Sequence, residues 1–99
     1  METLSFRFPA GQAPRLRAQV GCVGSGDLEV LAEPGESGIL NIQVVTSVNG
    51  SGERWKALFE RMFAGANPPA LNVDIHDFGA TPGVVRLRLE QALEEVADV

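Results

Sequence analysis

Apolar residues change their spacing near residue 50, and this change constrains the fold more than any other feature of the sequence. Residues 39–48 form a β-branched segment that is apolar enough for an interior strand with both faces covered. A segment with helical spacing follows, and then Leu71, Val73 and Ile75 alternate with polar residues as in a strand. A strand, a helix and a strand in this order predict a right-handed crossover between two parallel strands.

The helix of this crossover has recognisable ends. Ser51 is a suitable N-cap, Gly65 suits the left-handed position that ends a helix, and Pro68 with Pro69 prevents continuation. The apolar residues recur at offsets of three and four, which places them on one face: Trp55, Leu58, Phe59, Met62 and Phe63.

Residues 1–31 show the two-residue period of strands. Leu4, Phe6 and Phe8 alternate with polar residues, and residues 15–20 and 27–31 give two further strands on either side of a glycine-rich segment. Turn-forming residues then follow at positions 34–38.

The last segment fits two structures. Thr81 and Pro82 are a good N-cap and first helical residue, but residues 85–89 also alternate as in a strand. We predict a helix of about sixteen residues, because strong helix formers dominate positions 90–94. The whole chain is then expected to form a single domain over residues 1–99 with an α+β fold. It would be a mixed, mainly antiparallel sheet of about five strands with two helices packed on one face.

Charge and composition exclude several classes of protein. Thirteen acidic residues against eight basic ones give a net charge of −5, which disfavours nucleic acid and anionic membranes as partners. No apolar run approaches the ~20 residues that span a bilayer. The start of the chain does not resemble a secretion signal, and Cys22 is the only cysteine, so no intramolecular disulfide can form. We expect a cytoplasmic protein.

Residues suited to catalysis are few. His76 is the only histidine, which rules out a metal site with two histidines. Asp74, His76 and Asp77 allow a small carboxylate–imidazole group at the end of a strand, although a solvated loop histidine is the commoner case. Cys22 has apolar neighbours and is expected to be a small buried residue. We therefore predict no catalytic residue and no metal site.

The segment Gly24-Ser25-Gly26 stands out for a different reason. Glycine on both sides removes steric bulk, so the serine hydroxyl is expected on a tight, open turn that a modifying enzyme can approach. Judged from spacing alone, an ordinary hairpin turn explains the segment better. The glycine pattern of nucleotide-binding loops and their phosphate-binding lysine are both missing here.

Three segments carry a resemblance to a known family: residues 20–31, residues 42–50 and residues 74–91. Together they resemble the acyl carrier subunit of malonate decarboxylase, its delta subunit, over nearly the whole chain. The acyl carrier subunit of citrate lyase is more distantly similar.

This resemblance implies a non-catalytic carrier. In the family, the serine that matches Ser25 is linked through a phosphodiester to 2′-(5″-triphosphoribosyl)-3′-dephospho-CoA, and Gly24 and Gly26 flank the attachment. The terminal thiol of this arm carries acetyl or malonyl as a thioester. The implied partners are the acetyl/malonyl transferase subunit, the carboxylase-like decarboxylase subunits, malonyl transferase and the transferase that attaches the prosthetic group. By proximity, we expect Asp27 and Glu29 to contribute to docking.

Three alternatives remain at this stage. One is a scaffold subunit in which Ser25 is only a turn residue, and another is a small enzyme that uses Asp74, His76 and Asp77. The third is a citrate lyase carrier, which would use the same arm.

Overall fold

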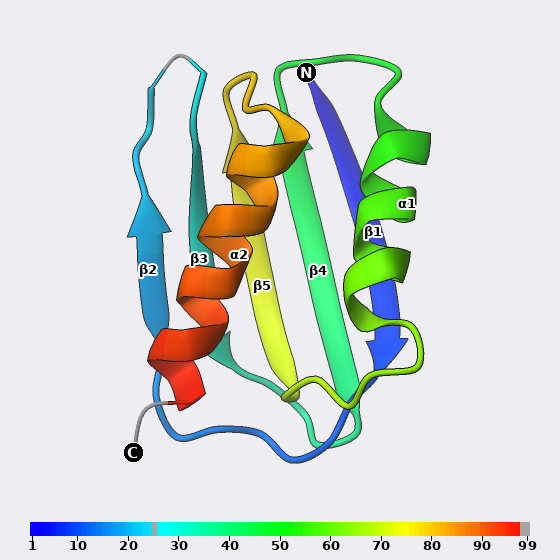
Figure 1. The fold of residues 1–99 in the computed structure, drawn as a ribbon, viewed down its shortest axis with the longest axis vertical. Coiled ribbons are helices and arrows are strands. Elements are labelled where there is room, and N and C mark those ends of the chain that lie inside the picture. Colours follow the sequence, from blue (N-terminus) through cyan, green and yellow to red (C-terminus); the bar gives the residue numbers. More distant parts are fainter. Residues whose placement is uncertain (25, 98–99) are drawn as a thin grey trace.

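Five strands and two helices make up the fold, and the structure, a computed structural model, describes residues 1–24 and 26–97. The sheet has the strand order β1-β4-β5-β3-β2 (Figure 1). Its strands are β1 (Glu2–Pro9), β2 (Ala18–Gly21), β3 (Leu28–Pro34), β4 (Ile39–Thr46) and β5 (Leu71–Asp77), and the helices are α1 (Gly52–Phe63) and α2 (Pro82–Ala97).

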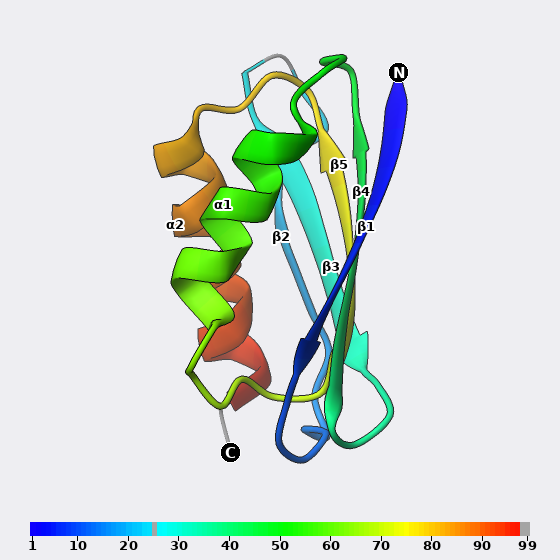
Figure 2. The same cartoon turned by 90° about the vertical axis from the view of Figure 1, so that its right-hand side faces the viewer.

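The predicted parallel pair of strands joined by a helix is confirmed. The right-handed sense predicted for the crossover is wrong, because β5 lies to the left of β4 when the helices face the viewer and β4 points up (Figure 1). Strands β4 and β5 are parallel, and α1 connects them, whereas the pairs β1–β4, β3–β5 and β2–β3 are antiparallel. Both helices lie on the same face of the sheet (Figure 2). The predicted α+β fold, a mainly antiparallel sheet with two helices on one face, is therefore confirmed.

The core lies between the sheet and the two helices. Phe59 of α1 is fully buried and stacks edge-on against Phe6 of β1, with ring centroids 5.0 Å apart. Helix α2 buries one face over β2 and β3, where it covers the buried side chains of the hairpin. The largest buried side chains of the sheet are Leu28, Val30, Leu40, Ile42, Val44, Leu71 and Ile75.

One expectation about β4 is wrong. The strand lies inside the sheet, but its burial alternates along the chain, so only one of its faces is covered. On the other face Gln43 is exposed, and Asn41 hydrogen-bonds Arg7 and Asn72 across the neighbouring strands. Because both helices pack on a single face, the apolar composition of β4 does not require two covered faces.

The element boundaries follow local chemistry, with two corrections. Ser51 is the N-cap of α1, but its hydroxyl donates to the carbonyl of Val48 instead of accepting from the first helical turn. The strand predicted over residues 15–20 covers only Ala18–Gly21. The left-handed Gly65 and the helical assignment of the last segment are both confirmed, since Gly65 has φ +75° and α2 runs over Pro82–Ala97. Within the described residues, neither helix is long and apolar enough to span a membrane.

Candidate functional site

The glycine-rich segment connects β2 and β3 (Figure 1). Because it contains Ser25, the residue predicted to carry a prosthetic group, we refer to residues 22–27 as the attachment loop. Its base is closed by the antiparallel pair of Gly21 with Glu29 and by a hydrogen bond of 3.2 Å from the Cys22 amide to the Leu28 carbonyl. Gly21 has φ +88°, and a Cβ there would collide with the Leu28 carbonyl oxygen. Only glycine therefore allows this closure.

The tip of the attachment loop contains the predicted site residues. Ser25 lies outside the described residues. At Gly24 and at Gly26, an added Cβ would meet no atom within 4 Å, so the space on both sides of position 25 is open. Gly26 also has φ +78°, a conformation that side-chain-bearing residues rarely adopt.

Asp27 fixes the second half of the attachment loop. Its amide donates to the Gly24 carbonyl over 3.1 Å, and its Oδ1 accepts from the Leu28 amide over 2.7 Å. The Arg88 guanidinium of α2 donates to both carboxylate oxygens, at 2.9 Å from Nη2 and 3.3 Å from Nε. Hydrogen bonding to Arg88 lowers the pKa of the Asp27 carboxyl, and the same bond raises the pKa of Arg88.

The segment between β5 and α2 provides a second anchor for the attachment loop. The Gly26 amide donates to the Phe78 carbonyl over 2.9 Å, and the Phe78 amide donates back to the Asp27 carbonyl over 3.0 Å. The loop is thus held to α2 by a side-chain pair and to the end of β5 by a pair of backbone bonds.

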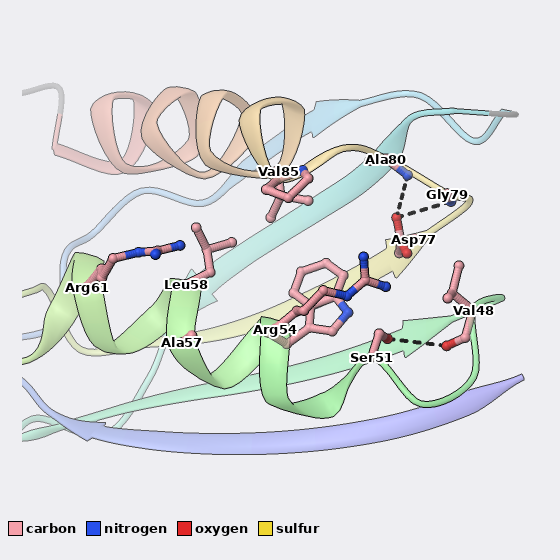
Figure 3. A pocket seen from close by; sticks show the side chains of 12 residues that line it. Val48, Ser51, Arg54, Ala57, Leu58, Arg61, Asp77, Gly79, Ala80 and Val85 are labelled. Atoms are coloured by element: carbon pink, nitrogen blue, oxygen red, sulfur yellow. Dashed lines mark hydrogen bonds between the residues drawn. The ribbon is translucent and has the colours of Figure 1, made fainter.

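Asp77 holds the segment that carries Phe78. Its side chain is buried, and its Oδ1 accepts from the amides of Gly79 (3.2 Å) and Ala80 (2.9 Å), as drawn in Figure 3. Its Oδ2 accepts from the hydroxyl of fully buried Thr46 over 2.7 Å. A buried carboxylate thus orders the turn that anchors the attachment loop.

A pocket of about 520 Å³ opens between α1 and α2 on the same side of the sheet (Figure 3). Trp55, Leu58 and Val85 give it apolar walls. Two arginines of α1, Arg54 and Arg61, also line it. We call this cavity the interhelical pocket.

The structure does not bring together Asp74, His76 and Asp77, the three residues considered for a carboxylate–imidazole group. His76 and Asp74 lie on the face of β5 that no helix covers, and Asp77 points to the opposite, buried face. The nearest acid to His76 is Glu29 of β3, with 3.6 Å between Nδ1 and Oε1. Across residues 1–24 and 26–97, no cluster of three or more His, Cys, Asp or Glu side chains suited to a metal ion occurs.

The prediction that Cys22 is buried is wrong. Cys22 is exposed and follows the last residue of β2, so it is not part of the sheet. Asp27 and Glu29 are predicted to contribute to docking, and the structure shows that both carboxylates have hydrogen-bond partners. The Asp27 carboxylate is paired with Arg88, and Glu29 accepts a hydrogen bond of 2.9 Å from Gln19. Docking through these two acids stays a prediction, but neither is an unpaired charge.

Sequence reasoning missed the role of Arg88. It lies 61 positions from Asp27 in the chain, and the sequence gives no local signal for the pair. The interhelical pocket was missed as well, since its walls come from separate segments.

A family model described as "Malonate decarboxylase delta subunit (MdcD)" matches residues 15–96. The chain belongs to this family. The match includes the attachment loop, both of its anchors and every residue that lines the interhelical pocket. The resemblance inferred from residues 20–31, 42–50 and 74–91 is therefore confirmed.

Individual relatives agree with the family assignment. The chain is 86% identical over 99 residues to the malonate decarboxylase acyl carrier protein of Azotobacter vinelandii, covering 100% of both. It is 76% identical over 96 residues to the protein of the same name from Pseudomonas syringae pv. tomato, covering 97% of each. A chain in the crystal structure of a Pseudomonas malonate decarboxylase hetero-tetramer in complex with malonate has 74% identity and a TM-score of 0.96. That match covers 98% of the present chain and 100% of the other.

Proposed function

We propose that this chain is the acyl carrier subunit of a malonate decarboxylase and catalyses no step itself. In this proposal the Ser25 hydroxyl displaces diphosphate from 2′-(5″-triphosphoribosyl)-3′-dephospho-CoA, so that Ser25 carries the 2′-(5″-phosphoribosyl)-3′-dephospho-CoA group through a phosphodiester. The observation that carries the proposal is the open space at Gly24 and Gly26 together with the fixed base of the attachment loop. Gly24 and Gly26 leave free space beside position 25, while residues on both sides of the tip are held by hydrogen bonds.

The residues present are compatible with such an arm. When bound, the prosthetic group supplies a terminal thiol that holds acetyl or malonyl as a thioester. The chain's own part is to fix the root: Arg88 holds Asp27, and Phe78 holds Gly26. A flexible arm on a fixed root raises the local concentration of the acyl group at each partner's active site without any new contact.

Partner subunits are part of the proposal. The solved relative belongs to a hetero-tetramer, which supports a role for this chain in an assembly of several subunits. We propose that the arm moves between an acetyl/malonyl transferase subunit and carboxylase-like decarboxylase subunits. The net charge of −5 favours docking on basic surfaces of these partners.

Intact-mass measurement of the protein purified from its native cells tests the proposal. We expect an added mass equal to the phosphoribosyl-dephospho-CoA group, located on the peptide that contains Ser25 and lost in Ser25→Ala. Ser37→Ala is the matched control, because Ser37 is exposed and precedes the left-handed Gly38 between two strands, as Ser25 precedes the left-handed Gly26 in the sequence. An unmodified chain in an active complex would refute the carrier function and leave Ser25 as a turn residue.

A further inference from the structure

We propose that the interhelical pocket binds the phosphorylated nucleotide part of the arm when the arm is not engaged by a partner. The geometry and the charge of the pocket do not depend on the carrier function. Only the identity of its occupant rests on the carrier function proposed above.

The position of the interhelical pocket is the first argument. Asp77, Gly79 and Ala80 line it, and Phe78 between them exchanges backbone hydrogen bonds with the attachment loop. The attachment loop, the β4–α1 connection and the β5–α2 connection all lie at one end of the molecule (Figure 1). The pocket wall and the root of the arm therefore share one short segment of chain.

The charge of the pocket is the second argument. Arg54 and Arg61 are about two turns apart on α1 and both line the cavity, with the Arg54 guanidinium extending over it (Figure 3). Neither forms an ion pair with any residue that the structure describes. Among the described residues, Asp77 is the one carboxylate in the lining, and amide and hydroxyl donors occupy both of its oxygens. The pocket is thus locally basic on a chain of net charge −5.

The apolar walls of the pocket indicate which kind of anion it can bind. Trp55, Leu58 and Val85 offer apolar and aromatic surface, which suits an organic ligand better than a free inorganic ion. A volume of about 520 Å³ is in the range of small-molecule pockets. An apolar cavity with two guanidinium groups matches a nucleotide, whose base fills apolar space and whose phosphates accept from arginine.

Tethering makes this docking feasible even when the intrinsic affinity is weak. A short flexible link gives an effective concentration of about 1 mM or more. A nucleotide that binds in solution with a Kd of about 1 mM would then occupy the pocket for half of the time or more when it is attached to the loop. Docking of this strength leaves the arm free to move to a partner.

Comparison of the arm-free and arm-carrying chains by amide NMR tests the proposal, after mass measurement has established loading. We expect the amide chemical shifts of Arg54, Arg61, Ala80 and Val85 to change, in addition to those of the attachment loop. Shifts confined to residues 22–28 and 78, in a chain shown to carry the arm, would refute the pocket but leave the carrier function intact. Absence of the arm would refute both proposals.

Titration of free dephospho-CoA into the arm-free chain gives an independent readout. Trp55 is the only tryptophan, so its fluorescence reports on the pocket wall. We expect about tenfold weaker binding for the double variant Arg54→Ala/Arg61→Ala, because charge-assisted hydrogen bonds to phosphate are lost. Arg86→Ala is the control: it also removes an exposed arginine, but Arg86 pairs with Glu90 and does not line the pocket. Equal affinity of all three proteins would overturn the proposal.

Discussion

Replacement of Asp77 by alanine removes the acceptor of three side-chain hydrogen bonds at the base of the candidate site. Each such bond to a charged acceptor contributes about 1.5–3 kcal/mol. The Gly79 and Ala80 amides lie near the surface and can bond water instead, but the hydroxyl of Thr46 is fully buried and cannot. We therefore expect a loss of about 2–4 kcal/mol in the free energy of unfolding, well below the sum of three bonds.

Urea denaturation followed by circular dichroism measures this loss, and thermal denaturation should show a fall in Tm of about 10 °C or more. Asp77→Asn is the matched control. Its amide oxygen can still accept from Gly79 and Ala80, and its NH₂ group can donate to the Thr46 oxygen. We expect this variant to lose about 1 kcal/mol or less.

The same substitution should loosen the attachment loop. Asp77 orders the turn that contains Phe78, and Phe78 holds Gly26 by a backbone bond. Hydrogen exchange at the Gly26 amide should be faster in Asp77→Ala than in Asp77→Asn, in conditions where both are folded. Equal stability of the two variants, or unchanged exchange at Gly26, would refute the view that Asp77 supports the loop.

Three further predictions concern the attachment loop. Gly21→Ala should lower the free energy of unfolding by about 1–3 kcal/mol in urea denaturation, because φ +88° and a nearby carbonyl oxygen leave no room for a Cβ. Arg88 lowers the pKa of Asp27 below its ordinary value of 3.8, so their pair stabilises the fold above about pH 4 and this contribution disappears as pH falls through the lowered pKa. The stability difference between wild type and Asp27→Asn should accordingly shrink in acid, and a constant difference from pH 7 to the acid limit would contradict the pairing. Val23 is 66% exposed in the loop, so Val23→Ser should weaken binding to partner subunits about threefold to tenfold in a titration, whereas Leu16→Ser, 44% exposed outside the loop, should not.

Local patterns in the sequence are sufficient to predict the elements of this fold. Alternation predicted β1 and β5, helical spacing predicted α1, and the succession of strand, helix and strand predicted that β4 and β5 are parallel. The strand order was not predictable in the same way. Which strands become neighbours depends on contacts between residues that lie far apart in the chain, and local sequence patterns do not show these contacts.

The grouping considered for Asp77 and the burial predicted for Cys22 were wrong, because neighbours in the sequence do not show what surrounds a residue in the fold. Asp77 was grouped with His76, but adjacent residues of a strand point to opposite faces, so one side chain is buried under the helices and the other is exposed. Cys22 was judged by its apolar neighbours, although a residue in a loop has no sheet to pack against. The open space at Gly24 and Gly26 was predictable, because it follows from the absence of a side chain at each glycine.

Strand direction explains why the attachment loop and the interhelical pocket lie together. Because β3 is antiparallel to β5, the start of β3 lies beside the end of β5, and Leu28 pairs with Asp77. Because β4 is parallel to β5, its end reaches the same edge, and Thr46 pairs with Asp77 as well. The loops that follow β4 and β5 and precede β3 must then converge around one buried carboxylate. In the proposed carrier, the root of the arm and the mouth of the interhelical pocket would therefore lie at the same end of the sheet.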